Sequence, residues 1–209
     1  MNPCDFGGYI FDVDGTLYSQ NKVRIAMLFR LLVYYAFRPF QWRKLCALFL
    51  FRRLQEDPSS RGKSIDEICM EVSKRLSLPK SAVHWTVRFW MFENPLDLLL
   101  KYRYEDVFEF IKYEHSSGKR IIIYSDYPAA EKLNIMRIPY DLLFVSGEKD
   151  IKEQKPSAEA MGKIIAASKL TTDELIYIGD RDDRDRASAE LVHITYCDIH
   201  TFRRNISYF

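Results

Sequence analysis

Two carboxylates stand one residue apart near the start of the chain, directly after an apolar run. Tyr9, Ile10 and Phe11 lead into Asp12 and Asp14, and a glycine follows at position 15. Apolar residues of this kind favour a buried strand, and Gly15 permits the tight turn that ends it. Two neighbouring carboxylates repel each other, and burying both without a partner is unfavourable. The pattern therefore indicates a site that must also contain a cation.

Three further groups of polar residues follow later apolar runs. Ser125 and Asp126 come after residues 121–124, Lys155 precedes a predicted helix, and a stretch from Gly179 to Asp185 follows residues 175–178. The carboxyl ends of parallel strands lie along one edge of a sheet, so these groups can converge on one site. A carboxylate nucleophile, a second acid, a hydroxyl, a cation and further acids for a metal are the groups that phosphoryl transfer requires.

The elements that position these residues alternate between strand and helix. Short apolar runs at 121–124, 142–145 and 175–178, with a last strand around 193–196, are separated by predicted helices at about 105–117, 128–135, 157–168 and 184–190. This alternation predicts an α/β fold with a doubly wound parallel sheet. Residues 22–37, 41–55, 64–76 and 81–92 read instead as consecutive helices. We therefore expect a discontinuous Rossmann-like core of residues 1–18 and 103–209, with a mainly helical cap domain of residues 19–102 inserted after the first strand.

With these motifs in order, the sequence resembles the haloacid dehalogenase-like (HAD) phosphohydrolase superfamily. The first motif is Asp12-Val13-Asp14-Gly15-Thr16, and Ser125, Lys155 and Gly179-Asp180 with Asp185 correspond to the other three. The resemblance covers the core, residues 5–19 and about 103–200, and the insertion lies where the family carries a helical cap. It is specific for fold and reaction class, and it says little about the substrate.

The resemblance implies a role for each motif residue. Asp12 is expected to attack phosphorus and form an aspartyl-phosphate, and Asp14 to act as the general acid and then as the base. Ser125 is expected to hydrogen-bond a phosphoryl oxygen, and Lys155 to offset negative charge. A Mg²⁺ cofactor is expected on Asp12, the backbone carbonyl of Asp14, and Asp180.

The fourth motif departs from a common form of the family pattern. Its acids often stand four residues apart, but position 184 is an arginine. Asp185 fits the longer spacing and is expected to support the metal site, with Asp183 as the alternative. Family dehalogenases lack an acid at the position of Asp14, whereas this chain has one. The resemblance therefore favours a phosphohydrolase over a dehalogenase.

Charge is distributed unevenly along the chain. Residues 20–105 contain 16 Lys plus Arg against 8 Asp plus Glu, a balance of +8, while the remainder has a balance of −6. Residues 18–54 contain eight basic residues and no acidic one, among many aromatic side chains. Solvated arginines over a packed helical core explain most such patterns. The alternative is that some of these arginines line the entrance for an anionic substrate or contact an anionic membrane surface; the candidates are Arg30, Arg38, Arg43, Arg52 and Arg53.

Other classes of function find less support. The cysteines (Cys4, Cys46, Cys69 and Cys197) form no Cys-x-x-Cys pair, which favours neither a zinc site nor a disulfide framework and suits the cytoplasm. No signal peptide or membrane-spanning run is visible. No nucleic-acid-binding motif accompanies the basic residues, so we expect no nucleic-acid partner.

We therefore expect a Mg²⁺-dependent phosphatase that hydrolyses a phosphomonoester of a small metabolite. Two alternatives remain open. One is a phosphomutase that uses the same intermediate, and the other is a membrane-peripheral lipid-phosphate phosphatase or binding module that acts through its basic cap.

Overall fold

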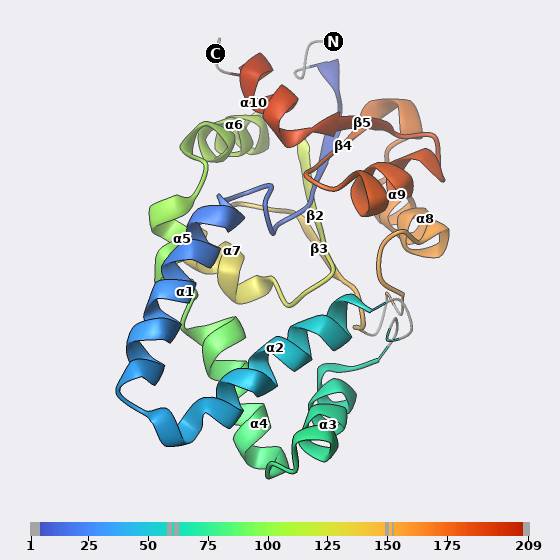
Figure 1. Cartoon of the computed structure of the whole chain (residues 1–209). Helices are drawn as coiled ribbons and strands as arrows, with labels where there is room; N and C mark the ends of the chain where they lie inside the picture. Colours follow the sequence, from blue (N-terminus) through green and yellow to red (C-terminus); the bar gives the residue numbers. More distant parts are fainter. Residues whose placement is uncertain (1–4, 58–59, 61–62, 149–150, 152, 207–209) are drawn as a thin grey trace. The chain divides into compact units, whose positions relative to one another are not determined.

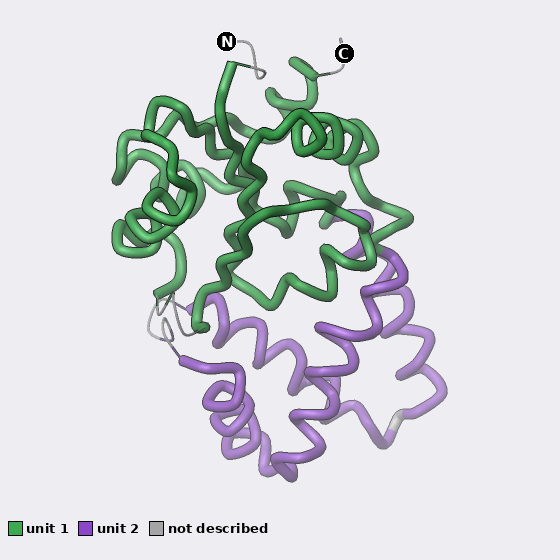
Figure 2. The backbone as a smooth tube through the Cα atoms, turned by 180° about the vertical axis from the view of Figure 1, so that it is seen from behind, with its two compact units in different colours: residues 1–20, 99–209 green, residues 21–98 purple. Residues whose placement is uncertain are grey.

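The computed structural model describes residues 5–57, 60, 63–148, 151 and 153–206. The chain forms two compact units, residues 1–20 with 99–209 and residues 21–98 (Figure 2). These limits lie two and four residues from the boundaries expected from the sequence. The difference arises because the helix α5, Leu96–Tyr102, spans the second limit and α1, Gln20–Ala36, begins just before the first.

The first unit is built on a five-stranded parallel sheet, as predicted (Figure 1). Its strand order is β3-β2-β1-β4-β5, with β1 at Gly8–Phe11, β2 at Arg120–Ser125, β3 at Leu142–Val145, β4 at Leu175–Gly179 and β5 at Thr195–Asp198. Phe11 lies opposite Ile123 of β2 and Ile178 of β4. The end of the central strand β1 is therefore flanked by the ends of β2 and β4, and the expectation of a doubly wound sheet is confirmed.

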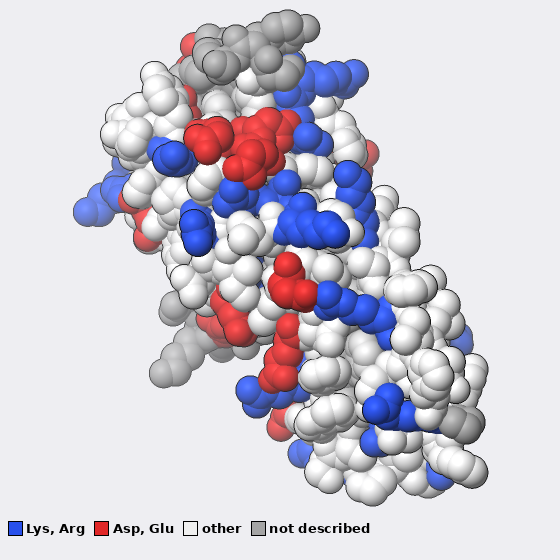
Figure 3. Space-filling view, turned by 90° about the vertical axis from the view of Figure 1, so that its left-hand side faces the viewer, with Lys and Arg blue, Asp and Glu red and all other residues white. Residues whose placement is uncertain are grey.

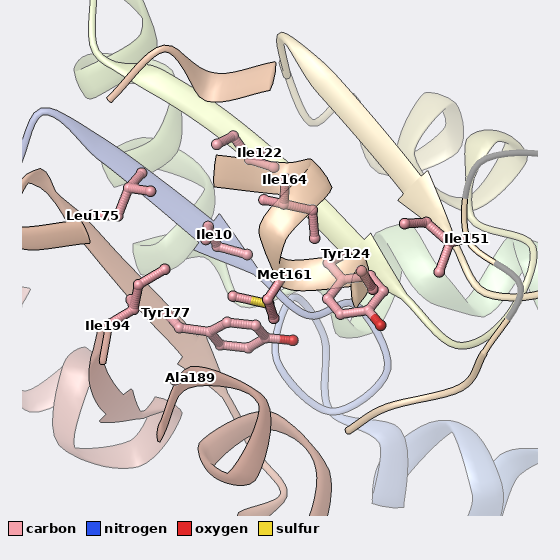
Figure 4. Close-up of a cluster of buried hydrophobic side chains, with 11 residues drawn as sticks. Ile10, Ile122, Tyr124, Ile151, Met161, Ile164, Leu175, Tyr177, Ala189 and Ile194 are labelled. Atoms are coloured by element: carbon pink, nitrogen blue, oxygen red, sulfur yellow. The ribbon is translucent and has the colours of Figure 1, made fainter. Parts of the chain in front are cut away.

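Alternate residues of β1 pack on opposite faces of the sheet, as the two-residue period of a strand requires. On one face, the ring of Tyr9 contacts Phe110 of α6 (Glu105–Ser116), and Phe11 contacts Phe202 of α10 (Ile199–Ile206). On the other face, Ile10 belongs to a buried cluster with residues of α8 (Ala158–Ser168) and α9 (Ala187–Glu190) (Figure 4). Apolar packing on both faces makes the sheet a rigid base for the polar residues at its edge.

The second unit is helical. It contains most of α1, a short 3₁₀ turn η2 (Pro39–Gln41), α2 (Trp42–Glu56), α3 (Ile65–Leu76), α4 (Lys80–Val87) and a π-helical turn η4 (Arg88–Glu93). A capping box begins α3, because the Ser64 hydroxyl accepts the backbone N–H of Glu67 at 3.2 Å and the Glu67 carboxylate accepts the backbone N–H of Ser64 at 2.7 Å. No helix among the described residues is long and apolar enough to cross a membrane.

Several predicted elements are displaced. The last strand begins two residues late because His193 has a left-handed φ of 56°. The helix expected at 184–190 begins as a π-helical turn η6 (Asp182–Arg186). The helix expected at 128–135 is α7, Ala130–Met136. The sequence patterns predicted neither α5, α10 nor the 3₁₀ turn η5 (Thr172–Glu174).

Candidate active site

The loop after β1 places Asp12 at the carboxyl end of the sheet. The backbone N–H of Asp12 donates to the carbonyl of Ile178 in β4 at 3.0 Å, so the residue continues the ladder after the strand ends. Gly15 then turns the chain with a φ of 105°. A Cβ atom at Gly15 would lie 2.2 Å from a carboxylate oxygen of Asp180. Glycine is therefore required here both for its backbone conformation and for the approach of the fourth motif to the first.

Lys155 forms ion pairs with both Asp12, the candidate nucleophile, and Asp185 of the fourth motif. Nζ of Lys155 lies 2.7 Å from Oδ1 of Asp12 and 2.9 Å from Oδ1 of Asp185. The lysine is 1% exposed, and Asp185 is equally buried. Burial alone would lower the pKa of Lys155, but the two carboxylates outweigh it and raise that pKa well above its usual value. Lys155 is therefore a fixed positive charge in the site.

Two buried tyrosines enclose this ammonium group. The ring centroids of Tyr124 and Tyr177 lie 4.7 and 5.6 Å from Nζ of Lys155, and the Tyr177 hydroxyl donates to Oδ1 of Asp185 at 3.1 Å. Both rings belong to the buried cluster on the same side of the sheet (Figure 4). Aromatic faces attract cations in dry surroundings. The tyrosines therefore stabilise the lysine where water is excluded, and the sequence analysis did not identify them.

Three acidic residues offer oxygens for a metal ion. Oxygen atoms of Asp12, Asp180 and Asp185 all lie within 4.8 Å of one another. Burial raises the pKa of Asp12 to about 8 in spite of Lys155, and it raises the pKa of Asp180 to about 6, with Asp185 adding to both increases. Oδ1 of Asp180 is buried without a hydrogen-bond partner among the described residues. One lysine faces three carboxylates, so the cluster fits a divalent cation with oxygen ligands.

Asp14 contacts a different set of side chains from the three carboxylates of this cluster. Nζ of Lys132 in α7 lies 2.6 and 2.7 Å from the two carboxylate oxygens of Asp14, and the hydroxyl of Tyr18 donates to one of them. Burial alone would raise the pKa of Asp14, but Lys132 and Tyr18 outweigh it and lower that pKa. The two acids of the first motif therefore have unlike surroundings, which raise the pKa of Asp12 and lower the pKa of Asp14.

Ser125 is the last residue of β2, next to β1, and it is 1% exposed. Its hydroxyl oxygen accepts the backbone N–H of Tyr127 at 3.2 Å, as a serine does at the start of a turn. An accepting hydroxyl keeps its own proton to donate. Thr16 supplies another hydroxyl, which donates to Oδ2 of Asp12 at 3.2 Å. Thr16 of the first motif had no role assigned from the sequence, and this contact indicates that Thr16 orients Asp12.

Asp126 connects three of the loops that follow the strands. Its Oδ1 accepts the backbone N–H of Lys155 at 2.9 Å and the hydroxyl of Ser146 at 3.0 Å. Its Oδ2 lies 2.7 Å from Nη1 of Arg184, and both side chains are less than 10% exposed. Arg184, which interrupts the usual acid spacing, is thus a buried partner of the second motif. The ion pair fixes the loop that carries Lys155.

The alternatives at the fourth motif are distinguished by their positions. Asp183 lies on the surface and pairs with Arg181 at 2.9 Å, which lowers the pKa of Asp183. Asp185 is buried, and a Cβ atom at Gly179 would lie 2.5 Å from it. The structure therefore brings Asp185 to the cluster and leaves Asp183 outside it.

The arginines considered as anion contacts belong to the helical unit. Arg30 pairs with Asp97 at 2.6 Å, Arg43 donates to the carbonyl of Leu76, and Arg38 stacks on the ring of Tyr34. Arg52 and Arg53 are exposed on α2. Among the cysteines, Cys46, Cys69 and Cys197 are free, and Cys4 lies outside the described residues.

Comparison with known proteins gives the family. The haloacid dehalogenase-like hydrolase profile matches residues 63–199, which include Ser125, Lys155 and Asp180. No curated protein sequence matches significantly.

Solved structures with the same fold cover most of the chain. They include a HAD-hydrolase, YfnB, from Bacillus subtilis, described as bound to magnesium, with a TM-score of 0.67 and 15% identity over 92% of this chain and 87% of that one. A 2-haloacid dehalogenase from Pseudomonas syringae has a TM-score of 0.62 and 16% identity, covering 90% of this chain and 84% of that one. A protein described as a phosphoglycolate phosphatase from Lactobacillus plantarum has a TM-score of 0.56 and 14% identity, covering 100% and 92%.

Identities this low show the fold, and the profile match over more than half of the sequence shows the family. The chain belongs to the haloacid dehalogenase-like hydrolases.

Proposed function

We propose that this hydrolase is a Mg²⁺-dependent phosphatase that hydrolyses a phosphomonoester of a small metabolite through an aspartyl-phosphate at Asp12. One observation carries the proposal. The Asp12 carboxylate is buried beside one fixed ammonium group and two further carboxylates, and a second, differently tuned acid lies two residues away. A dehalogenase also needs a carboxylate nucleophile, but it has no use for that second acid.

Asp12 is the nucleophile in this mechanism. Thr16 holds its Oδ2 and Lys155 its Oδ1, so the carboxylate has a fixed orientation before substrate arrives. An oxygen of Asp12 attacks phosphorus, and the bond between phosphorus and the leaving oxygen breaks. The hydroxyl of Ser125 donates to a phosphoryl oxygen, and Lys155 offsets the charge that collects between the phosphate and Asp12.

Asp14 is the general acid and the general base. Its pairing with Lys132 favours the carboxylate form. In the second step this carboxylate takes a proton from the water that attacks phosphorus, and the bond between phosphorus and the Asp12 oxygen breaks, which releases inorganic phosphate. In the first step Asp14 must donate a proton to the leaving oxygen. The negative charge of an incoming phosphate raises the pKa of Asp14 and attracts the Lys132 ammonium group, so substrate binding itself favours the protonated acid.

Asp12 and Asp180 are the side chains that would hold the cation, with the backbone carbonyl of Asp14 as a further ligand. Asp185 already accepts bonds from Lys155, from the Tyr177 hydroxyl and from the backbone N–H of Arg181 at 3.1 Å. It therefore orients Lys155 and adds negative charge to the site. Mg²⁺ bound here supplies charge neutralisation for the carboxylates and for the substrate phosphate.

The helical unit, residues 21–98, is proposed to act as the cap that selects the leaving group and excludes water during the attack. A phosphomutase would return the phosphate to a reoriented sugar, whereas a phosphatase releases it. Measuring inorganic phosphate and isomer formation in parallel on hexose phosphates separates the two outcomes.

The test compares two Asp→Asn variants with Mg²⁺ and with EDTA, using an aryl phosphate and a panel of phosphorylated metabolites. Asp12→Asn should abolish phosphate release while leaving the circular dichroism spectrum unchanged. Asp183→Asn is the matched control, because that carboxylate is exposed and paired with Arg181, and it should retain activity. Full activity of Asp12→Asn would overturn the assignment of the nucleophile.

A further inference from the structure

The outer face of α1 is apolar although it is exposed. Ile25, Phe29 and Leu32 are 70%, 68% and 57% exposed, and Leu28 and Val33 are also exposed. Spacings of three and four residues place these five side chains on one side of the helix. Val23 and Met27 are buried on the opposite side. A surface helix normally has one apolar side and one polar side, so a second apolar side that is exposed is suited to a partner.

Exposed apolar residues continue beyond the end of α1. Phe37, Phe40 and Trp42 are 79%, 99% and 52% exposed at the connection between α1 and α2. Eight of the fifteen large hydrophobic residues recorded as exposed among the described residues fall between positions 25 and 42. Single exposed apolar residues are normal on a protein surface, but a concentration of this kind marks an interaction surface. We refer to these eight residues as the α1 surface.

The exposed charges on α1 and the turn that follows it are basic. Residues 18–54 contain no acidic residue, and Arg24 and Arg38 are exposed, whereas Arg30 pairs with Asp97. The lower right part of Figure 3 shows this region as a broad area of uncharged side chains with scattered basic groups. Aromatic and aliphatic side chains flanked by arginines are the combination found where a helix lies in the headgroup region of an anionic bilayer.

A groove formed partly by residues of the α1 surface has an apolar lining. It has a volume of about 370 Å³ and is lined by Phe29, Val33 and Phe37, with Arg38 and Asn94 among its polar groups. An apolar groove of this size suits part of an acyl chain, which is the apolar part of a lipid. The groove therefore offers a place for single lipid molecules within the larger surface.

We propose that the α1 surface docks the protein onto a membrane that contains anionic phospholipids. The helix lies in the interface rather than crossing it, since no described helix is long and apolar enough to span a bilayer. A second copy of the chain fits less well. A symmetric dimer places the same surface on both partners, so its basic residues would face each other.

The experiment measures co-sedimentation of the full chain with vesicles of phosphatidylcholine alone and of phosphatidylcholine mixed with phosphatidylglycerol. Binding is expected to the mixed vesicles at low salt and to weaken as salt is added. Phe29→Glu/Leu32→Glu should abolish it, and Arg24→Gln should reduce the partition coefficient about fivefold, the effect of one basic residue near an anionic surface. The matched control is Tyr113→Glu/Leu191→Glu, which replaces two exposed apolar residues of the other unit and should bind like the unchanged protein.

Three results would overturn the proposal. They are absence of binding to mixed vesicles at low salt, equal loss in the control pair, and a concentration-dependent dimer that Phe29→Glu/Leu32→Glu dissociates. Hydrolysis of an aryl phosphate, measured on the same samples without vesicles, should be equal in all four proteins. Loss of docking and loss of catalysis can therefore be distinguished.

Discussion

Replacing Lys155 by methionine removes the positive charge at the centre of the site while keeping most of the side-chain volume. The ammonium group lies within 3 Å of two carboxylates, and Lys155 is 1% exposed, so the ion pairs are shielded from solvent. Breaking a buried ion pair from one side costs about 3–5 kcal/mol, because it leaves an uncompensated buried charge. Without metal near pH 8, we expect Lys155→Met to lower the free energy of unfolding by about that amount.

The loss of stability caused by Lys155→Met should be larger at high pH than at low pH. The pKa of Asp12 is raised to about 8 by burial, above its value of 3.8 in an unfolded chain. A carboxyl group of this kind stabilises the fold fully below the unfolded pKa and loses that contribution as pH rises through the folded pKa. At about pH 5 Asp12 is protonated in the folded protein, so the missing ammonium group leaves less unpaired charge. The destabilisation by Lys155→Met should therefore be smaller there than at about pH 8.

Urea denaturation in EDTA at the two pH values measures both effects. The matched control is Lys163→Met, which breaks an exposed pair with Glu159 and should cost less than about 1 kcal/mol at either pH. The reasoning is refuted if Lys155→Met is no more destabilising than this control near pH 8, or if its cost grows on acidification.

Three further predictions concern the carboxylates. Mg²⁺ should raise the melting temperature more at about pH 8 than at about pH 5. The pKa values of Asp12 and Asp180 are raised, so at the lower pH protons compete with the metal for these carboxylates. An equal shift at both pH values would contradict the proposed ligands. Lys132→Gln should raise the pKa of Asp14 and move the acidic limb of the pH–rate profile to higher pH, and an unchanged profile would exclude this ion pair from catalysis. Gly15→Ala should weaken metal binding and so remove metal-dependent activity, because the added Cβ atom clashes with the carboxylate of Asp180. Calorimetric titration with Mg²⁺ measures the affinity, and an unchanged affinity would refute the steric argument.

The sheet could be predicted because its signals are local. Apolar runs followed by polar residues identify β1, β2 and β4 and place Asp12, Ser125 and Asp180 at their ends. The position of β5 was wrong by two residues, since a left-handed turn at His193 has no clear sequence signature without glycine.

Residues that act through distant contacts could not be found in this way. Lys132 reaches Asp14 across 118 positions, and nothing in its own sequence neighbourhood distinguishes it from a solvated lysine. Tyr124 and Tyr177 read as strand residues, and the sequence does not show that their rings enclose Lys155. Arg184 appeared in the sequence as a departure from a pattern, and its pairing with Asp126 depends on how two loops meet.

The chemical state of Asp12 during turnover tests the central claim most directly. The protein is mixed with an aryl phosphate and Mg²⁺, quenched in acid within the first turnovers, digested and examined by mass spectrometry. The aspartyl-phosphate mechanism predicts one phosphoryl group on the peptide that contains Asp12, and none in Asp12→Asn. It predicts more in Asp14→Asn, because an aryloxide can leave without a proton from Asp14 but water is no longer activated. Phosphate release with no phosphoryl group on that peptide in either the unchanged protein or Asp14→Asn would contradict the mechanism.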